Sequence, residues 1–397
     1  MTNPKKAILH SGKEKSLSRR HPWIFSGALK HHDKDIEEGD IVRVFSDKGE
    51  FLCIGHWQNG SIAIKILSFE DEPINQDFVS RRIRAAVSMR RLQGLFTDDH
   101  TTIFRLVNGE GDFMPSLIVD YYDGLVVVQF HGVGMYRLKE EIKKALQDTL
   151  QSNCKAIYCK SSSTLPKQEG IIAKDEFMYG TLEEDWYALE NGIRYKIDYS
   201  LGQKTGFFID QRDNRKLVCE MSEGRTVLNA FAYTGGFSLS AIKGKAKEVV
   251  SMDISARATA ICDKNVKENF PQANNHRSIT ADVLDYMEQM EKGSYDLIIL
   301  DPPAFAKHQR HTQQALKGYR AINRKAIEKI ASGGLLFTFS GSQAVSSDEF
   351  ATMLFSCAAL SGRKVRIIKR LAAGGDHPQS IFHPEGEYLK GMLLYVE

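Results

Sequence analysis

The sequence has few cysteines and no long apolar run. Of its 397 residues 6 are cysteines, and no stretch reaches the roughly 18 apolar residues of a membrane span. None of the cysteines forms a Cys-x-x-Cys pair, and no histidine lies at zinc-ligand spacing from them, which argues against a metal site or a disulfide framework. The opening residues lack the apolar core of a signal peptide. Together with the isolated thiols, this predicts a cytoplasmic protein.

An excess of charge of one sign is also missing, except at the N-terminus. The chain has 53 Lys and Arg against 50 Asp and Glu, a net charge of +3. Residues 1–30, however, contain a single acidic residue, Glu14. Their basic residues are Lys5, Lys6, Lys13, Lys15, Arg19, Arg20 and Lys30. Such a run forms either a solvated face or a surface that contacts phosphates.

Three changes of pattern along the chain predict three domains. Residues 1–75 alternate apolar and polar positions around Asn59-Gly60, a strong hairpin signal, and predict a small all-β domain. Residues 76–192 mix helices with hairpins, as in a central α+β domain. Residues 193–397 alternate short apolar strands with helices, which predicts a doubly wound, mainly parallel sheet that ends in an antiparallel pair.

Polar residues and glycines follow the predicted strands of the third domain. Ligands of a doubly wound sheet bind beyond the carboxyl ends of its strands. Gly235 and Gly236 lie between a strand and a helix, where a ligand can approach the backbone closely. Asp253 ends the next strand at the position of a ribose-binding carboxylate, and Asp282 is placed to accept an adenine amino group. Asp301-Pro302-Pro303 ends a further strand.

The ligand that suits these positions is S-adenosylmethionine. A dinucleotide needs a Gly-x-Gly-x-x-Gly loop for its pyrophosphate, whereas this loop has only two adjacent glycines followed by Phe237. The missing loop argues against a nicotinamide-dependent oxidoreductase. Each aspartate alone is equally consistent with a helix cap, and their order and spacing together carry the prediction.

The same motifs resemble a known family. The run KTGFFIDQR from Lys204 and the segments NAFAYTGGF, MDIS, ADV and DPPAFAK are similar to those of the ribosomal RNA large subunit methyltransferase I family. EKSLSRRHPWIFSGAL resembles its PUA RNA-binding module, and DHPQSIFHPEGEYLKG resembles its closing segment. The resemblance implies an α/β fold: a Rossmann-like class I methyltransferase domain, an N-terminal PUA-like β-barrel and a central α+β domain. It also implies S-adenosylmethionine-dependent methylation of a cytosine C5 in large-subunit (23S) ribosomal RNA.

The resemblance extends to individual residues. Asp301 and Pro302 would face the target base and are the candidate catalytic residues. The candidate cofactor-binding residues are Asn229, Phe231, Tyr233, Gly235, Asp253, Ile254, Asp282, Val283 and Asp301. Arg19, Arg20 and Trp23 are candidate RNA-binding residues, with packing of the small barrel as the alternative for Trp23. The expected partner is large-subunit ribosomal RNA, with no metal and no membrane, and a homodimer is left open.

One position departs from the family pattern. Cytosine C5 is a poor nucleophile, and the usual solution is a cysteine thiolate that adds to C6. The family has that cysteine in a Ser-Cys-Ser-like motif, where this chain has Gly341 between Ser340 and Ser342. A serine alkoxide is far less available at neutral pH than a thiolate, and Cys357 is predicted to lie in the core. Methylation of a base nitrogen such as guanine N7, or a catalytically impaired RNA-binding paralogue, therefore stand as alternatives.

Overall fold

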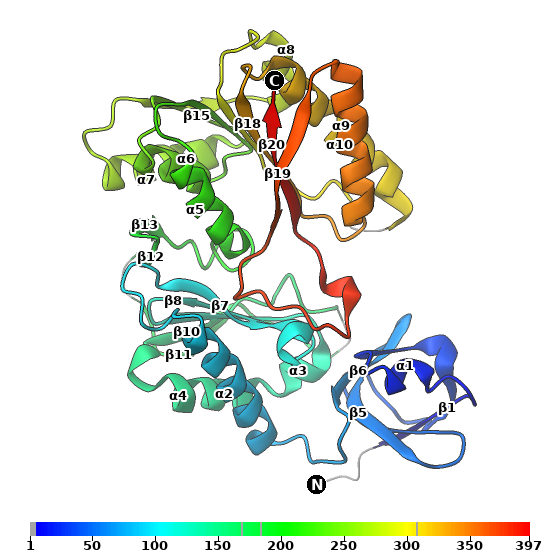
Figure 1. Cartoon of the computed structure of the whole chain (residues 1–397). Coiled ribbons are helices and arrows are strands. Elements are labelled where there is room, and N and C mark those ends of the chain that lie inside the picture. Colours follow the sequence, from blue (N-terminus) through cyan, green and yellow to red (C-terminus); the bar gives the residue numbers. More distant parts are fainter. Residues whose placement is uncertain (1–4, 168–169, 183–184, 307–308) are drawn as a thin grey trace. The chain divides into compact units, whose positions relative to one another are not determined.

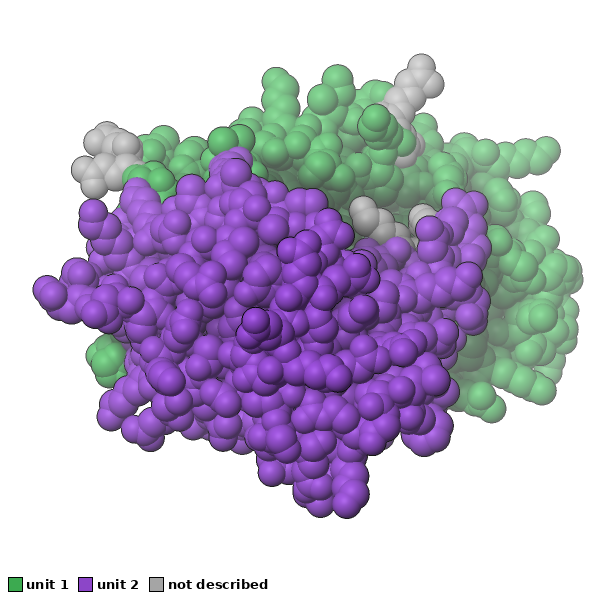
Figure 2. Space-filling model, turned by 90° about the horizontal axis from the view of Figure 1, so that it is seen from above, with its two compact units in different colours: residues 1–190, 196–209, 375–386 green, residues 191–195, 210–374, 387–397 purple. Residues whose placement is uncertain are grey.

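The computed structural model describes residues 5–167, 170–182, 185–306 and 309–397. The chain forms two compact units (Figures 1 and 2). The first comprises residues 1–190, 196–209 and 375–386, and the second comprises residues 191–195, 210–374 and 387–397.

The N-terminal part of the first unit is a six-stranded sheet of order β2-β6-β5-β4-β1-β3. Its elements are β1 (Lys5–Leu9), α1 (Lys15–Ser18), β2 (Trp23–Phe25), η1 (Ser26–Ala28), β3 (Leu29–His32), β4 (Ile41–Phe45), β5 (Phe51–Trp57) and β6 (Ile62–Ser68). Asn59-Gly60 joins β5 to β6, which pair antiparallel as predicted. The apolar positions that alternate along β4, such as Val42 and Val44, are buried in a core of their own.

The rest of the first unit is a five-stranded sheet of order β11-β10-β9-β8-β7 with helices packed against it. Its elements are α2 (Gln76–Leu92), β7 (Ile103–Asn108), η2 (Gly109–Asp112), β8 (Leu117–Tyr122), β9 (Leu125–Phe130), α3 (Val133–Arg137), α4 (Lys139–Leu150), η3 (Gln151–Asn153), β10 (Ala156–Cys159) and β11 (Glu176–Tyr179). Asp123 and Gly124 have positive φ angles of 50° and 100° and form the tight β8–β9 turn. β12 (Tyr187–Glu190) and β13 (Ile193–Lys196) follow along the chain.

Two segments of the predicted third domain belong to the first unit. Thr205 Oγ1 donates a hydrogen bond of 2.6 Å to Asp120 of β8, and Arg90 of α2 donates one of 2.7 Å to the carbonyl of Asp376. These buried contacts explain why residues 196–209 and 375–386 cluster with the central sheet. The compact units thus differ from the predicted boundary at residue 193, and the three-domain division stays a prediction.

The second unit has the predicted doubly wound sheet. Its strands lie in the order β16-β15-β14-β17-β18-β20-β19, parallel from β16 to β18 and antiparallel at β20 and β19. Helices α5, α6 and α7 lie on one side of the sheet, and α8, α9 and α10 cover the other (Figure 1). The elements are η4 (Ile209–Gln211), α5 (Arg212–Glu220), β14 (Thr226–Ala230), α6 (Gly236–Lys243), β15 (Glu248–Asp253), α7 (Ala256–Asn269), β16 (His276–Thr280), α8 (Val283–Gln289), β17 (Leu297–Leu300), η5 (Gln309–His311), α9 (Thr312–Lys329), β18 (Gly334–Ser340), α10 (Ser347–Ser361), β19 (Val365–Ala372) and β20 (Lys390–Val396), with η6 (Pro384–Gly386) between the last two strands.

Within the described ranges, no helix has both the length and the apolar character that a bilayer span requires.

Candidate functional site

The carboxyl ends of the parallel strands lie level with one another in the second unit. Ala230 of β14 pairs with Met252 of β15 and with Leu300 of β17, and Asp253 pairs with Thr280 of β16. The residues that follow these strands therefore meet at one edge of the sheet, where ligands of such sheets bind.

The loop between β14 and α6 is a tight, clamped turn. Phe231, Tyr233 and Gly235 have positive φ angles of 63°, 48° and 88°. The amide of Ala232 donates to the carbonyl of Met252 (2.7 Å), and the amide of Gly235 donates to the carbonyl of Ala232 (2.9 Å). A Cβ atom on Gly235 would lie 2.4 Å from Cys262 Sγ, so only glycine fits there. The loop thus offers a fixed stretch of backbone to a ligand at the sheet edge.

Asp253 holds this loop in place. Its Oδ2 accepts a hydrogen bond from the Tyr233 amide and its Oδ1 accepts one from the Ser255 amide, both of 2.9 Å. Each carboxylate oxygen can accept a second hydrogen bond, so a partly exposed Asp253 can also receive donors from a ribose. The next residue, Ile254, is 75% exposed, and its side chain offers an apolar surface beside that carboxylate.

Asp282 is the N-cap of α8. Its Oδ1 accepts hydrogen bonds from the amides of Leu284 (2.8 Å) and Asp285 (3.2 Å). The cap uses only Oδ1. Because the side chain of Asp282 is exposed, its Oδ2 can accept a hydrogen bond from an amino group of a ligand. Val283 begins the helix, and its side chain is buried in the core on the α8–α10 side.

Two buried polar side chains of the second unit have an atom without a hydrogen-bond partner among the described residues. The side chain of Asn229 is buried and donates to Ser238 Oγ (2.8 Å), but its Oδ1 has no hydrogen-bond partner among the described residues. The buried Nε2 of Gln211 in η4 is also without a partner in this part of the chain. Buried polar atoms of native proteins are nearly always paired. Asn229 lies near the carboxyl end of β14, so its Oδ1 suits a hydrogen bond to a bound cofactor, whereas water or a ligand would pair Gln211 Nε2.

The Asp301-Pro302 segment continues into a loop that packs on α9. Asp301 is partly exposed and Pro302 is buried. The ring of Phe305 lies 4.7 Å from that of Tyr319, over Gly318 of α9, where a Cβ atom would approach the ring to 3.1 Å. Lys307, the last residue of the DPPAFAK motif, lies outside the described residues.

Gly341 directly follows β18. Apart from its two chain neighbours, no atom of the described residues lies within 4 Å of a Cβ atom built on it. Ser340 and Ser342 on either side are buried, and Ser342 Oγ donates to the carbonyl of Ala306 at 2.6 Å. Neither serine hydroxyl is therefore presented to a substrate.

Lys390 also contributes to the site, although none of the sequence motifs predicts it. It is buried at the start of β20, and its Nζ donates to the carbonyls of Ser342 (2.8 Å) and Val345 (2.5 Å). Burial lowers the pKa of Lys390. Lys390 fixes the loop that follows Gly341, and a lysine inside the otherwise apolar strand KGMLLYV was the signal for it.

The cysteines are free thiols, and five of the six are buried. Burial raises the pKa of Cys154, Cys262 and Cys357 to about 11. Thiols of this kind are protonated at neutral pH and are poor nucleophiles. Within the described ranges, no cluster of three or more His, Cys, Asp or Glu side chains could hold a metal ion.

The predicted RNA-binding residues lie in the first unit. Arg19 and Arg20 are exposed, and the Arg20 guanidinium lies 5.5 Å from the ring of Phe69. Trp23 is half-buried, and its Nε1 donates to Glu110 Oε1 at 3.1 Å. The tryptophan thus makes an internal contact with η2, which follows β7, and its contact with RNA stays a prediction.

Comparison with known proteins identifies the family. The model of the S-adenosylmethionine-dependent methyltransferases matches residues 104–384, and that of the PUA-like domain matches residues 7–69. The chain is 36% identical to ribosomal RNA large subunit methyltransferase I of Aeromonas hydrophila over 97% of this chain and 98% of the relative. It is 37% identical to the protein of the same name from Aeromonas salmonicida, with the same coverage.

Solved structures share the fold. A chain from Streptococcus mutans described as a SAM-dependent methyltransferase has a TM-score of 0.83 and 24% identity, covering 98% of this chain and 100% of that one. A second methyltransferase structure, complexed with SAH, has a TM-score of 0.84 at the same identity and coverage. The predicted fold class, enzyme class and cofactor are confirmed. The chain belongs to the S-adenosylmethionine-dependent methyltransferase family that includes the ribosomal RNA large subunit methyltransferases I, and it is an enzyme that uses S-adenosylmethionine.

Proposed function

We propose that this enzyme methylates a base of large-subunit ribosomal RNA, and that the acceptor atom is a ring nitrogen. The curated relatives named above support the class of RNA. The observation that favours nitrogen is the absence of a side chain at Gly341, between two serines that are buried. A cytoplasmic site of action follows from such a substrate.

The cofactor would be held by the residues at the sheet edge. When bound, S-adenosylmethionine supplies an electrophilic methyl group. Asp253 would accept hydrogen bonds from its ribose, Asp282 would accept one from its adenine, and Ile254 would pack against the adenine ring. The backbone of the loop from Phe231 to Gly235, fixed by its contacts with Met252 and Asp253, would face the methionine part.

A ring nitrogen needs no covalent help from the enzyme. Its lone pair would take the methyl group directly while the bond from that group to the sulfonium sulfur breaks and leaves a neutral thioether. The protein must then only orient the base and stabilise the charge that develops. Carbon C5 of cytosine would instead need a nucleophile that adds to C6. None of the thiols of the second unit suits this role, because burial raises the pKa of Cys219, Cys262 and Cys357.

The segment that begins at Asp301 would orient the base. The carboxylate of Asp301 can accept a hydrogen bond from an exocyclic amine or a ring N–H of the target base. Phe305 is 37% exposed and its ring is held by Tyr319, so it can stack on a base without being reordered. Ser342 and Lys390 would act as positioning residues, since Ser342 binds the carbonyl of Ala306 in this segment and Lys390 fixes the loop that contains Ser342.

A methyl-transfer assay tests the proposal. The full-length enzyme, radiolabelled S-adenosylmethionine and an unmodified transcript of large-subunit ribosomal RNA would be incubated, and the digested nucleosides would be identified by mass spectrometry. We expect one nitrogen-methylated nucleoside and at least a tenfold loss of transfer in Asp301→Ala. Transfer to cytosine C5, which the family resemblance favours, would show that another residue supplies the nucleophile. Cofactor binding without any transfer would favour the catalytically impaired RNA-binding protein.

A further inference from the structure

The connection between β19 and β20 carries an exposed apolar turn. Residues 375–386 of this connection belong to the first unit. The amide of His383 donates to the carbonyl of Ser380 (2.9 Å), and the amide of Phe382 donates to Ser380 Oγ (3.3 Å). The amide of Gly386 donates to the carbonyl of His383 (3.0 Å), which continues the turn into η6. These hydrogen bonds define the shape of the turn that carries Ile381 and Phe382.

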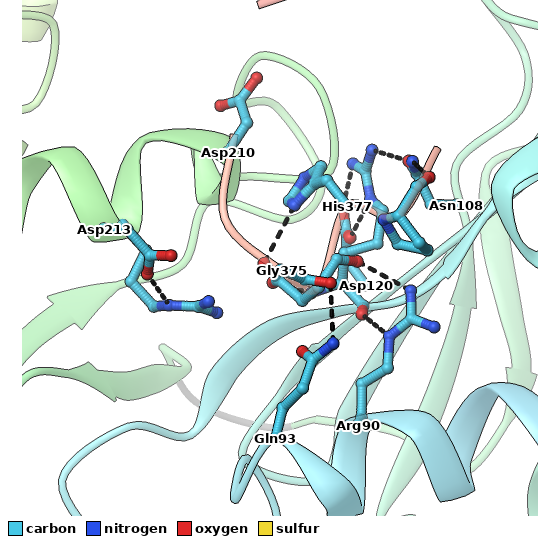
Figure 3. A network of polar contacts seen from close by, with 12 residues as sticks. Arg90, Gln93, Asn108, Asp120, Asp210, Asp213, Gly375 and His377 are labelled. Carbon is cyan, nitrogen blue, oxygen red and sulfur yellow. Dashed lines mark hydrogen bonds and ion pairs between the residues drawn. The ribbon is translucent and has the colours of Figure 1, made fainter. Parts of the chain in front are cut away.

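The residues before the turn are fixed by a buried polar network, part of which Figure 3 shows. Arg90 is fully buried, forms two hydrogen bonds with the carboxylate of Asp112 (2.6 and 2.8 Å) and donates to the carbonyl of Asp376. Asn108 donates to the carbonyl of Pro378 at 2.9 Å, and Gln93 donates to that of Gly375 at 2.9 Å. The segment that leads into the turn is therefore rigidly attached to the central sheet.

The residues after the turn are fixed by aromatic rings. The buried ring of His383 lies 4.3 Å from the indole of Trp23 in an edge-on arrangement. That indole donates to Glu110, which also lies 3.5 Å from Lys65 Nζ. The carboxylate of Glu385 lies 3.3 Å from His21 Nε2. The turn is thus held on both sides and cannot fold its own side chains inward without breaking these contacts.

Between these two attachments the apolar side chains point outward. Ile381 is 90% exposed and Phe382 is 41% exposed, and Phe25, beside the ring of His21, is 48% exposed. Single exposed apolar residues are common on protein surfaces and do not by themselves indicate a binding site. Two in succession on a turn that is anchored from both ends form a preshaped apolar projection, which is a feature of contact surfaces.

Four cationic residues precede His21, Trp23 and Phe25 in the sequence. Lys13, Lys15, Arg19 and Arg20 are exposed in and beside α1, and none has a carboxylate partner within the part of the chain that is described. Unpaired exposed cations suit the phosphates of a nucleic acid. Exposed aromatic and branched apolar side chains suit the faces of unstacked bases.

We infer that Ile381 and Phe382 form a wedge that stacks against bases of the RNA substrate, while Arg19 and Arg20 contact its phosphates. This inference rests on the proposed function, because it takes the ribosomal RNA substrate as given. The wedge also assigns base stacking to Phe382 rather than to Trp23, whose indole is engaged by Glu110 and His383. Apolar side chains inserted between bases stabilise the unstacked state of a nucleic acid.

Binding of RNA to matched variants tests the wedge. The probe is an in vitro transcript of large-subunit ribosomal RNA, and the dissociation constant is measured from low to high salt by filter binding. For the double variant Ile381→Ala with Phe382→Ala, we expect about a tenfold weaker affinity with an unchanged salt slope, because bases rather than phosphates lose a contact. For Arg19→Gln with Arg20→Gln, we expect a shallower slope, since each lost phosphate contact lowers it by about 0.7–0.9.

The control is a second pair of exposed apolar residues. Phe355 and Leu360 on α10 are 73% and 60% exposed, and Phe355→Ala with Leu360→Ala should leave both affinity and slope unchanged. An unchanged affinity of the wedge variant, or an equal loss in the control, would overturn the inference. A changed sedimentation coefficient with unchanged RNA affinity would also overturn it, in favour of contact between two copies. If the wild-type enzyme transfers no methyl but the wedge variant still loses RNA affinity, the proposed function fails and the wedge remains.

Discussion

At the scale of single residues, Gly341 has room for the side chain that it lacks. Among the described residues other than its two chain neighbours, no atom lies within 4 Å of a Cβ atom built there. The flanking serines are buried and Lys390 fixes the following carbonyls. The loop around Gly341 therefore leaves room for a nucleophilic side chain and has not collapsed into the space that such a side chain would occupy.

This geometry predicts that Gly341→Cys adds an accessible thiol without loss of stability. We expect the thermal midpoint to change little, because the described residues leave room for the new Cβ atom. Titration of native protein at pH 8 with a thiol reagent should show one fast thiol more than in the wild type, whose cysteines are mostly buried. A slow reaction of the new cysteine would contradict the open position of Gly341.

Gly235 should be as intolerant as Gly341 is tolerant. Its φ angle of 88° and the 2.4 Å approach of a Cβ atom to Cys262 Sγ make any side chain costly. We expect Gly235→Ala to destabilise the second unit by about 1–3 kcal/mol and to abolish measurable binding of S-adenosylmethionine. Calorimetric titration with the cofactor measures the second effect, with Gly341→Ala as the matched control. Unaltered binding in Gly235→Ala would show that the loop does not carry the methionine part.

At the scale of elements, Arg90 links α2 to the connection between β19 and β20. Its guanidinium is fully buried and forms a fork with Asp112. Removal of one member of a buried ion pair leaves the other charge uncompensated, so Arg90→Met should cost about 3–5 kcal/mol. Arg90→Lys should recover only part of this, because an ammonium group cannot form the fork.

The stability of Arg90→Met can be measured for the first unit alone, because of where the three tryptophans lie. Trp23, Trp57 and Trp186 all lie in the first unit, so urea unfolding followed by tryptophan fluorescence reports on this unit. A midpoint for Arg90→Met equal to that of the wild type would contradict the role given to the network.

The contact between β5 and α3 should be sensitive to acid. His56 of β5 packs on Gly134 of α3, and its Nε2 has no hydrogen-bond partner among the described residues. Burial, with smaller contributions from the charges of Arg137 and Lys65, lowers the pKa of His56 to about 3. Below pH 6.5 the unfolded chain therefore binds a proton that the folded chain does not, and stability falls by about 1.4 kcal/mol per pH unit.

His56→Phe removes this titration while it keeps a ring at the contact. Between pH 7.5 and pH 5 the wild type should lose about 2 kcal/mol relative to the variant, as measured by the same fluorescence experiment. Parallel stability curves for the two proteins over this range would show that folded His56 binds a proton as readily as unfolded His56.

The sequence predicts the elements of the second unit better than the direction of its side chains. Apolar strands such as Leu297–Leu300 and the final antiparallel pair follow directly from the pattern. Strand β16 was not predicted, because His276–Thr280 is a mainly polar strand at the edge of the sheet. Only the structure shows that the side chain of Asp282 caps α8 and that Lys390 reaches the loop after Gly341.

At the scale of the whole molecule, segments far apart in sequence share one unit. Residues 196–209 and 375–386 follow the first unit because of side chains such as Asp120, Arg90 and Asn108. Such long-range polar contacts leave no periodic pattern, so the sequence does not indicate that these two segments cluster with the first unit. The family and its cofactor, in contrast, could be predicted because the motifs at the strand ends are short and ordered along the chain.

Tritium release from the substrate tests the central claim most directly. Ribosomal RNA would be transcribed with [5-³H]cytidine and methylated with ¹⁴C-labelled S-adenosylmethionine, so that both labels are counted in one reaction. Methylation at C5 must expel the hydrogen there, whereas methylation of a nitrogen leaves it in place. We predict incorporation of ¹⁴C with no tritium released to water. Release of one tritium for each methyl group incorporated would contradict the account and would assign the chain to cytosine C5.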